Sequence, residues 1–315
     1  MSYDMTKMDT SNWENLIKQS KKTKRKIKFK PFYNNKKFVK EKYESYFDKE
    51  LDFNNLKTFN EKLNGFKIDV ELMKKLSRYA DKHQVKKYVR KKIGAKHIIR
   101  EYFYKEKITV EDLEKLPNQF ILKTTLGSGT NFIVKNKKET NLQAVCDYMN
   151  LLTKVEYGYI HGELLYNYEK NMIIAEELLT DKDNNIPDDL KCFCFEDNAG
   201  NKRKILYVER VIGDNRERLM FDENWKSVNY NCSFKKLDEE IPKPKNLKEI
   251  LKVIDKLSEE FNFVRVDLFL FNNKIYFGEL TFIPTAGYLK FDNPEHDVEW
   301  GSWIGDNKII KPIEI

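Results

Sequence analysis

The stretch from Phe263 to Phe282, FVRVDLFLFNNKIYFGELTF, predicts two neighbouring β-strands that carry charged residues. Side chains alternate between the two faces of a strand, so Arg265 and Asp267 share one face of the first strand. Glu279 and Thr281 share a face of the second strand in the same way. Strands as apolar as these seldom carry charge without a partner or a ligand. If the two faces coincide, Asp267 and Glu279 offer the hard oxygen ligands that Mg²⁺ prefers.

The connection between the two strands decides whether the two carboxylates meet. A two-residue turn at 272–273 would leave Glu279 on the opposite face of the sheet from Asp267. A three-residue loop ending at Lys274, or a bulge of the same parity, would place the two Cβ atoms about 5 Å apart. We expect the odd parity, with an Asn or Lys274 in the left-handed conformation. The alternative is an ion pair of Arg265 with Glu279 on a solvated sheet.

The composition predicts a folded protein with a heavily charged surface. The chain has 315 residues, of which 34% are charged and 40% hydrophobic, and its net charge is +8. This length suits two or three sub-domains, and the hydrophobic content argues against disorder. The positive surplus favours anionic partners without choosing among them. The four cysteines show no CxxC spacing, so we expect reduced core residues.

Nothing in the sequence predicts a membrane span or a signal peptide, because no apolar run of about 18 residues occurs. We therefore expect a cytoplasmic protein, with the inner membrane surface as an alternative location. Residues 18–30 are strongly basic and leave peripheral membrane contact open, whereas we expect no nucleic-acid partner. We favour a solvated, poorly ordered tail for this segment.

The periodicity of apolar residues predicts an α+β fold with helices interleaved among mostly antiparallel strands. The first 80 or so residues are expected to be helical. A further helix is expected to begin at Asp81, which can cap it, and to end near Gly94. The clearest helix covers residues 246–257, with Asn246 and Glu249 forming a capping box. Strands are expected at 116–125, 132–135, 172–179, 191–195 and 205–208.

A glycine loop joins two of these strands. Gly127, Ser128 and Gly129 open a small, donor-rich segment whose backbone N–H groups can surround phosphate oxygens. It is not a P-loop, because no lysine follows the glycines to open a helix. A plain hairpin turn is the alternative. Lys123 favours the phosphate interpretation, since a lysine on an apolar strand usually has an anionic partner.

Two further segments are weaker candidates. Glu176, Glu177 and Leu178 end an apolar strand, where a peptide edge can pair with adenine, although an ordinary strand terminus is the favoured interpretation of this motif alone. Asp189 and Lys191 begin the next strand and suit a ribose hydroxyl and a phosphate.

Taken in order, these motifs resemble the ATP-grasp superfamily and, more narrowly, its teichuronopeptide-biosynthesis (TupA-like) branch. The resemblance runs from about Leu56 to about Gly287. The motifs that carry it are Asp81-Lys82, Ile121-Leu-Lys123, Gly127-Ser-Gly129, Ala175-Glu-Glu-Leu178, Asp189-Leu-Lys191, Val264-Arg-Val-Asp267 and Gly278-Glu-Leu-Thr-Phe282. Each motif is weak alone, and their succession is specific.

The resemblance implies an ATP-grasp fold in which ATP lies between two α+β lobes. Residues 1–78 would be a helical lead-in, 79–176 the central lobe with the glycine loop, and 177–315 the C-terminal lobe with the metal site.

The resemblance also implies roles for individual residues. Those near the phosphates would be Lys82, Lys123, Lys191 and the loop residues Gly127, Ser128 and Gly129. Those near the nucleoside would be Glu176, Glu177, Leu178 and Asp189. Arg265 would face the transferring phosphoryl group, and Asp267, Glu279 and Thr281 would hold the metals. Many ligases of the superfamily have Asn where this chain has Thr281, a weaker ligand, although the TupA-like branch itself carries Thr.

The resemblance implies an ATP- and Mg²⁺-dependent ligase that joins a carboxylate to an amine through an acyl phosphate. Its acceptor would be a small-molecule or glycan carboxylate, such as a cell-surface polysaccharide or a peptide-glycan polymer, and this rests on analogy alone. One alternative is an ATP-grasp kinase that transfers phosphate to a small molecule or glycan. Another is a glycan-associated transferase that does not use ATP.

Overall fold

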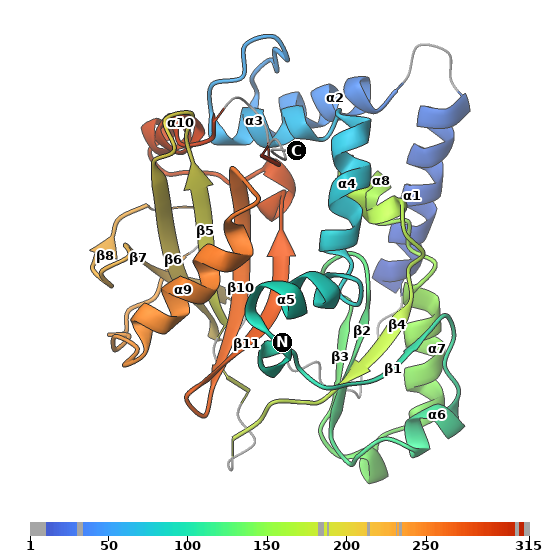
Figure 1. Cartoon of the computed structure of the whole chain (residues 1–315). Helices are drawn as coiled ribbons and strands as arrows, with labels where there is room; N and C mark the ends of the chain where they lie inside the picture. Colours follow the sequence, from blue (N-terminus) through green and yellow to red (C-terminus); the bar gives the residue numbers. More distant parts are fainter. Residues whose placement is uncertain are drawn as a thin grey trace. The chain divides into compact units, whose positions relative to one another are not determined.

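The computed structural model describes residues 11–29, 34–181, 186–187, 189–212, 215–230, 232, 235–305 and 309–311. Helices alternate with mostly antiparallel strands, which confirms the α+β prediction (Figure 1). The chain divides into two compact units. The first comprises residues up to Phe38, Met73–Lys86 and Ile99–Ile186, and the second comprises Val39–Leu72, Lys87–Ile98 and Pro187 onward. Within the described residues, no helix is both long and apolar enough to cross a membrane.

The first unit is built on a four-stranded antiparallel sheet. Its strands, in spatial order, are β1 (Glu101–Lys105), β4 (Ile173–Glu176), β2 (Phe120–Thr124) and β3 (Asn131–Val134). Helix α7 (Leu142–Leu152) packs its buried residues Val145 and Met149 into one hydrophobic cluster with Leu122 and Ile173 of the sheet. The predicted order of strand, glycine loop and strand is confirmed, and it leaves the loop at one end of β2 and β3.

The basic segment at 18–30 was predicted to be a poorly ordered tail, and this prediction is wrong for the described part. Residues Ser11–Phe29 form helix α1, while residue 30 lies outside the described residues. Ile17, Ser20 and Thr23 recur at every third position and are buried, with Ile17 packed against Val155 and Ile160. The helix therefore has a buried face that the charge run concealed.

The second unit contains a seven-stranded sheet in which all pairings are antiparallel except that of β7 with β9. Along the sheet the order is β11, β10, β5, β6, β7 and β8, and β9 pairs with β7. Their bounds are β5 Asp189–Glu196, β6 Lys202–Ile212, β7 Asn215–Phe221, β8 Ser227–Val228, β9 Lys235–Lys236, β10 Phe263–Phe271 and β11 Lys274–Thr281.

The remaining helices are short, with 4 to 13 residues each. They are α2 Asn35–Phe47, α3 Phe59–Phe66, α4 Val70–Ala80, α5 Val85–Ile93, α6 Val110–Glu114, α8 Gly158–His161, α9 Leu247–Ser258 and α10 Pro294–Ser302. Asp81 caps the chain ahead of α5 as predicted, because its Oδ1 accepts the N–H groups of His83 and Gln84, but the regular helix begins only at Val85. All four cysteines are free and buried, as predicted.

Helix α9 confirms the clearest helix of the sequence, although its predicted capping box is wrong. The Asn246 side chain makes no cap hydrogen bond, and a turn at 244–247 begins the helix instead. The helix packs on β10, where Val264, Val266 and Leu268 are fully buried (Figure 1). This leaves the opposite face of β10 for Arg265 and its neighbours.

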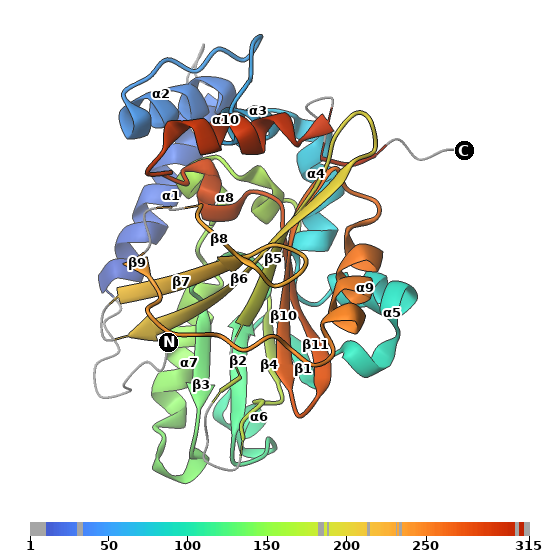
Figure 2. The ribbon, with the colours of Figure 1, turned by 90° about the vertical axis from the view of Figure 1, so that its left-hand side faces the viewer.

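That opposite face changes character along its strands. At one end, Phe59 of α3 contacts Phe193 and Phe263 edge to face, and Trp300 of α10 contacts Phe59 and Phe193 in the same way. Figure 2 shows α3 and α10 together at this end of the sheet. Further along the same face the aromatic side chains give way to charged ones, so the packed aromatic half anchors the strands that carry the charges.

The turn between β10 and β11 corrects one expectation and confirms another. Asn272 and Asn273 form a two-residue turn with φ of 50° and 57°, so the alternative of a three-residue loop is excluded, and an Asn rather than Lys274 takes the left-handed conformation, as one of the two expected alternatives had it. The register then shifts after Asp267, which leaves Gly278 as an extra residue in β11. This bulge restores the expected parity, and Asp267 pairs directly with Glu279.

We expect Gly278→Ala to destabilise the protein by about 1–3 kcal/mol, because an inserted atom must displace its neighbours. A Cβ at Gly278 would lie 2.9 Å from the carbonyl oxygen of Asp267. Urea unfolding measures the loss. The control is Lys274→Ala at an exposed position of the same strand, which should change stability by less than about 0.5 kcal/mol. Equal stability of the two variants would contradict a steric need for glycine at the bulge.

Candidate active site

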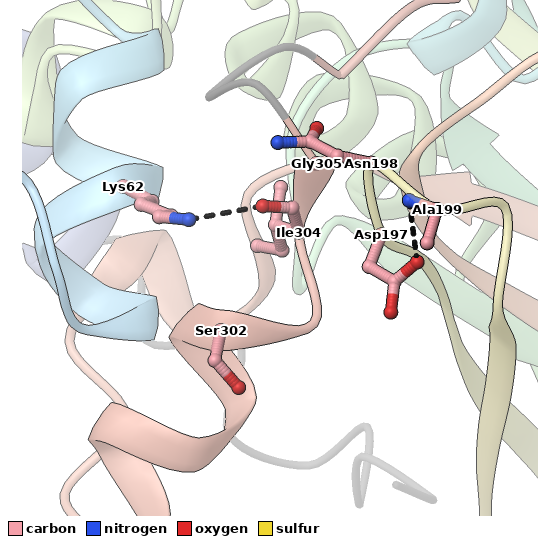
Figure 3. Close-up of a pocket in the computed structure, with 7 residues that line it drawn as sticks. All are labelled: Lys62, Asp197, Asn198, Ala199, Ser302, Ile304 and Gly305. Carbon is pink, nitrogen blue, oxygen red and sulfur yellow. Dashed lines mark hydrogen bonds between the residues drawn. The ribbon is translucent and has the colours of Figure 1, made fainter.

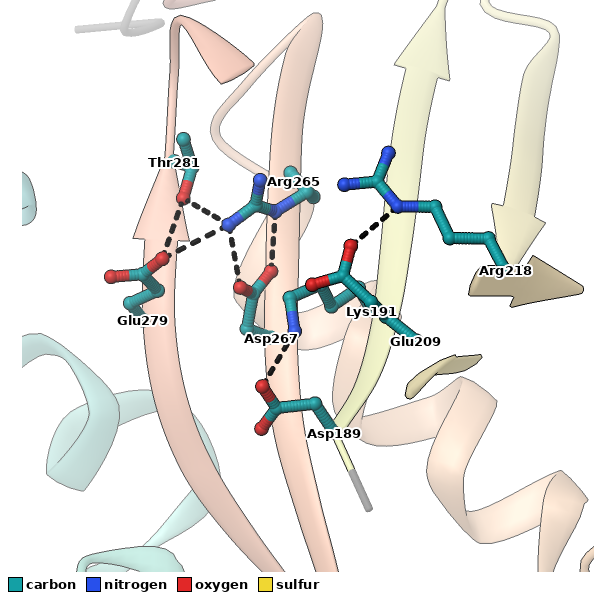
Figure 4. A network of polar contacts seen from close by, with 8 residues as sticks. All are labelled: Asp189, Lys191, Glu209, Arg218, Arg265, Asp267, Glu279 and Thr281. Carbon is teal, nitrogen blue, oxygen red and sulfur yellow. Dashed lines mark hydrogen bonds and ion pairs between the residues drawn. The ribbon is translucent and has the colours of Figure 1, made fainter. Parts of the chain in front are cut away.

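A guanidinium group joins the three residues that were predicted to hold metals (Figure 4). Arg265 donates from Nε to Asp267 Oδ1 and from an amino nitrogen to Asp267 Oδ2, both at 2.6 Å. The same amino nitrogen donates to Glu279 Oε1 at 2.9 Å and to Thr281 Oγ1 at 3.0 Å. The Thr281 hydroxyl in turn donates to Glu279 Oε1 at 3.2 Å. The bulge at Gly278 therefore brings all four predicted residues of the two strands into one cluster.

Burial shapes the charge of this cluster. Side-chain exposure is 7% for Asp267 and 41% for Glu279. Desolvation raises the pKa of Asp267 to about 7, although the charges of Arg265 and Lys191 act in the opposite direction. Burial disfavours the charged guanidinium as well, but Asp267 and its other neighbours outweigh this and raise the pKa of Arg265. Asp267 is thus a carboxylate whose ionised form an additional cation would favour.

A second ion pair continues the charged face onto β5. Lys191 is the direct cross-strand partner of Asp267, and its Nζ lies 2.6 Å from Asp189 Oδ2. Burial acts to lower the pKa of Lys191, but Asp267 and Asp189 together raise it. The structure therefore places the predicted residues Asp189 and Lys191 beside the predicted metal ligands.

The charged face continues with Glu209 on β6, which sequence reasoning missed, and with Arg218 on β7. Arg218 Nε lies 2.5 Å from Glu209 Oε2, and the guanidinium lies 4.8 Å from the centre of the Tyr207 ring (Figure 4). Glu209 on β6 pairs with Asp189 on β5, so Glu209 lies on the same face of the sheet as Asp189 and Lys191. No local motif marks this pair, because only the register of three strands brings it into line.

The donor set suits a magnesium ion that is completed by other ligands. Within the described residues, no group of three or more His, Cys, Asp or Glu side chains could hold a metal ion. Asp267 and Glu279 provide two carboxylates, and Thr281 adds a hydroxyl. Magnesium in proteins commonly binds through one or two carboxylates, with water and substrate phosphates supplying the rest. The cluster fits that mode, and it does not resemble a closed structural metal site.

In the first unit, Lys123 forms an ion pair with Glu176 rather than standing alone. The Lys123 Nζ lies 2.7 Å from Glu176 Oε2, and the Lys86 Nζ lies 2.5 Å from Glu176 Oε1. Burial acts to raise the pKa of Glu176, but the two lysines outweigh it and lower that pKa. The Glu176 side chain therefore lies between two ammonium groups. The main-chain N–H of Glu177 donates to the Arg100 carbonyl at 2.9 Å.

Sequence reasoning also missed Lys86 and Glu101, which extend this network. Lys86 Nζ lies 2.6 Å from Glu101 Oε2, and His83 Nδ1 lies 2.8 Å from Glu101 Oε1. Lys86 lies in helix α5, VKKYVRKKI, which contains four other positively charged residues, so the sequence alone does not single it out. Only its position beside Glu176 distinguishes it.

The glycine loop is held at its base and exposed at its tip. Lys82 Nζ donates to the Gly127 carbonyl oxygen at 2.8 Å, so Lys82 contacts the loop. The φ of Gly127 is +88°, and a Cβ there would lie 2.8 Å from the Tyr157 ring, so only glycine suits the position. Ser128 and Gly129 are exposed. The loop tip is therefore free to approach a ligand.

A pocket of about 470 Å³ in the second unit contains none of the predicted site residues. Its lining residues are Lys62, Asp197, Asn198, Ala199, Ser302, Ile304 and Gly305 (Figure 3). Lys62 donates to the Ile304 carbonyl oxygen, and Asp197 accepts from Ala199 and Asn201. Lys62 and Asp197 thus make local hydrogen bonds, and the pocket contains none of the charged groups of the sheet face.

Comparison with known proteins finds distant similarities to solved structures. Among solved structures, the chain is similar to D-alanine-D-alanine ligase from Helicobacter pylori, with 16% identity, 72% of this chain and 61% of that chain covered, and a TM-score of 0.41. It is also similar to a carboxyaminoimidazole ribonucleotide synthetase from Thermotoga maritima, with 17% identity, 68% and 48% covered, and a TM-score of 0.35. The chain thus spans about half to three-fifths of the length of these structures.

No curated protein matches the chain. A family model described as TupA-like ATPgrasp matches residues 61–305, which is most of the sequence and includes every predicted site residue. The chain therefore belongs to the TupA-like ATP-grasp family.

Proposed function

We propose that this protein is an ATP- and Mg²⁺-dependent ligase that joins a carboxylate to an amine through an acyl phosphate. The observation that carries the proposal is the hydrogen-bonded cluster of Arg265, Asp267, Glu279 and Thr281 on paired strands, in which Asp267 is buried. A buried arginine beside two carboxylates, in a member of this family, suits phosphoryl transfer better than a structural role, since structural ion pairs add little stability.

In this proposal the second unit provides the groups that act on the transferring phosphate. Asp267 and Glu279 would hold magnesium, with Thr281 as a weaker neutral ligand. When bound, magnesium would neutralise the charge of the phosphate oxygens. Arg265 would donate its planar fork to the phosphoryl group, for which a lysine is a poor substitute. Asp189 would face the ribose, and Lys191 a phosphate.

The first unit would provide the remaining nucleotide contacts. Lys82 and Lys123 would bind phosphate oxygens beneath the loop formed by Gly127, Ser128 and Gly129, whose tip is exposed. The peptide edge at 176–178 would meet adenine. Lys86 joins this set in our proposal because it shares Glu176 with Lys123. Positive groups at these positions would stabilise the charge that develops during transfer.

The acceptor belongs to the proposal at the level of chemical class. A carboxylate would attack the γ-phosphate to form an acyl phosphate and ADP, and an amine would then displace inorganic phosphate to form an amide. Family analogy points to a carboxylate of a cell-surface polysaccharide or peptide-glycan polymer. ADP release screened against amino acids, uronic acids and their polymers, with mass spectrometry of the product, tests this. Phosphorylated product without an amine would instead identify a kinase.

Lys123→Ala should largely abolish the thermal stabilisation that ATP with Mg²⁺ confers, because binding to the native state raises stability by mass action. The measurement is the shift in melting temperature with and without ATP. Lys135→Ala, at an exposed position just beyond β3, is the matched control and should keep the full shift. A full shift in Lys123→Ala would remove Lys123 from the nucleotide site.

Asp267→Asn and Glu279→Gln should keep the fold and lower turnover by orders of magnitude, since each removes ligand charge from the proposed magnesium site. Arg265→Lys should also fail, because it keeps the charge but loses the fork. ADP release measures turnover, and circular dichroism checks the fold. Glu249→Gln on the exposed face of α9 is the control for loss of one carboxylate. A near-normal rate in any of the three variants would exclude that residue from the mechanism.

A further inference from the structure

Resting on the proposed function, we propose that Arg265 serves as an internal substitute for the metal. Its guanidinium holds Asp267, Glu279 and Thr281 together, and it must leave Glu279 and Thr281 before a divalent cation can bind them. Nucleotide phosphate offers the guanidinium a new partner, so Arg265 couples the binding of nucleotide to the binding of metal.

One amino nitrogen of Arg265 contacts all three proposed metal ligands. The amino nitrogen of Arg265 lies 2.6 Å from Asp267 Oδ2, 2.9 Å from Glu279 Oε1 and 3.0 Å from Thr281 Oγ1. The Thr281 hydroxyl also donates to Glu279 Oε1, so that oxygen accepts from both neighbours. The guanidinium therefore occupies the position between the carboxylates that a shared cation would take.

The guanidinium and a metal ion cannot both bind Asp267 Oδ2 and Glu279 Oε1. Magnesium binds oxygen at about 2.0–2.1 Å, closer than any hydrogen-bond donor. A metal on Glu279 Oε1 and Asp267 Oδ2 would lie against the amino nitrogen that now contacts both atoms. Two cations at that separation in a poorly solvated site repel each other strongly. One of them has to withdraw.

The contacts of Arg265 also indicate which of them the side chain can release first. Asp267 Oδ1 is bonded by Nε, whereas the bonds to Glu279 and Thr281 come from the amino end of the group. Glu279 is also the more exposed carboxylate, with 41% of its side chain accessible against 7% for Asp267. Arg265 can therefore give up Glu279 and Thr281 while its Nε contact with Asp267 persists. A phosphate oxygen then replaces the lost acceptors.

The proposed competition between Arg265 and the metal can be measured as a change in metal affinity, without measuring turnover. If Arg265 competes with the metal, its removal raises the affinity for a divalent cation in the absence of nucleotide, although the same substitution abolishes catalysis. A residue that merely stabilised the carboxylates would have the opposite effect on metal affinity. The direction of the change therefore distinguishes the two roles.

The experiment measures Mn²⁺ binding to the full chain without nucleotide, by electron paramagnetic resonance. We expect Arg265→Gln to bind Mn²⁺ about tenfold more tightly than the wild type, within the usual range of coupling between sites. Lys274→Gln removes one positive charge at an exposed position of β11, outside the proposed site, and should leave the affinity unchanged. The double variant Arg265→Gln with Glu279→Gln should lose the increase in Mn²⁺ affinity that Arg265→Gln shows alone.

Arg265→Lys is the second variant, should Arg265→Gln fail to fold. A lysine ammonium has no planar fork and cannot bond all three ligands at once. This variant should therefore give a smaller gain in Mn²⁺ affinity than Arg265→Gln. Unchanged or weaker Mn²⁺ binding in the folded Arg265 variants would overturn the proposal. The proposed function fails by a different result, namely a wild-type protein that neither binds ATP with Mg²⁺ nor releases ADP.

Discussion

The pairing of Asp267 with Glu279 across β10 and β11 is the constraint on which the candidate site depends. A two-residue turn alone would place these carboxylates on opposite faces, and the extra residue at Gly278 reverses that outcome. The bulge requires a residue without a side chain because the Asp267 carbonyl lies so close. One glycine thus determines whether Arg265 meets one carboxylate or two.

The charged groups of the site are arranged as pairs that a nucleotide and a metal would have to rearrange. Arg265 bonds Asp267 and Glu279, and Lys191 bonds Asp189. Lys123 shares Glu176 with Lys86 in the same manner in the other unit. Because a buried charge without a partner is expensive, internal partners keep these cations in place before any ligand arrives. The cost is that each ligand must compete with a residue of the protein.

The rest of the second unit makes these positions rigid. The face of β10 that packs on α9 is wholly apolar, and the aromatic residues at one end of the other face interlock with α3 and α10. Strands fixed on both sides hold their side chains more accurately than loops do. The charged residues therefore occupy the part of a well-packed sheet where precise geometry is easiest to maintain.

The sequence by itself determined the strands β2 to β6, β10 and β11, the glycine loop, the shared face of Arg265 and Asp267, and the succession of motifs that identifies the family. These depend on alternation along a single strand and on the order of residues, which are local properties. It also predicted the parity of the hairpin, but it left loop and bulge as alternatives. The buried face of α1 and the missing cap at Asn246 were not apparent in the same local patterns.

Only the tertiary structure decided that the bulge lies at Gly278, that Lys86 shares Glu176 with Lys123, and that Glu209 and Arg218 join the charged face. Each of these depends on strands or helices that are distant in sequence. The register between such elements is set by packing and by the need to neutralise buried charge across the whole sheet, and no single segment contains that information.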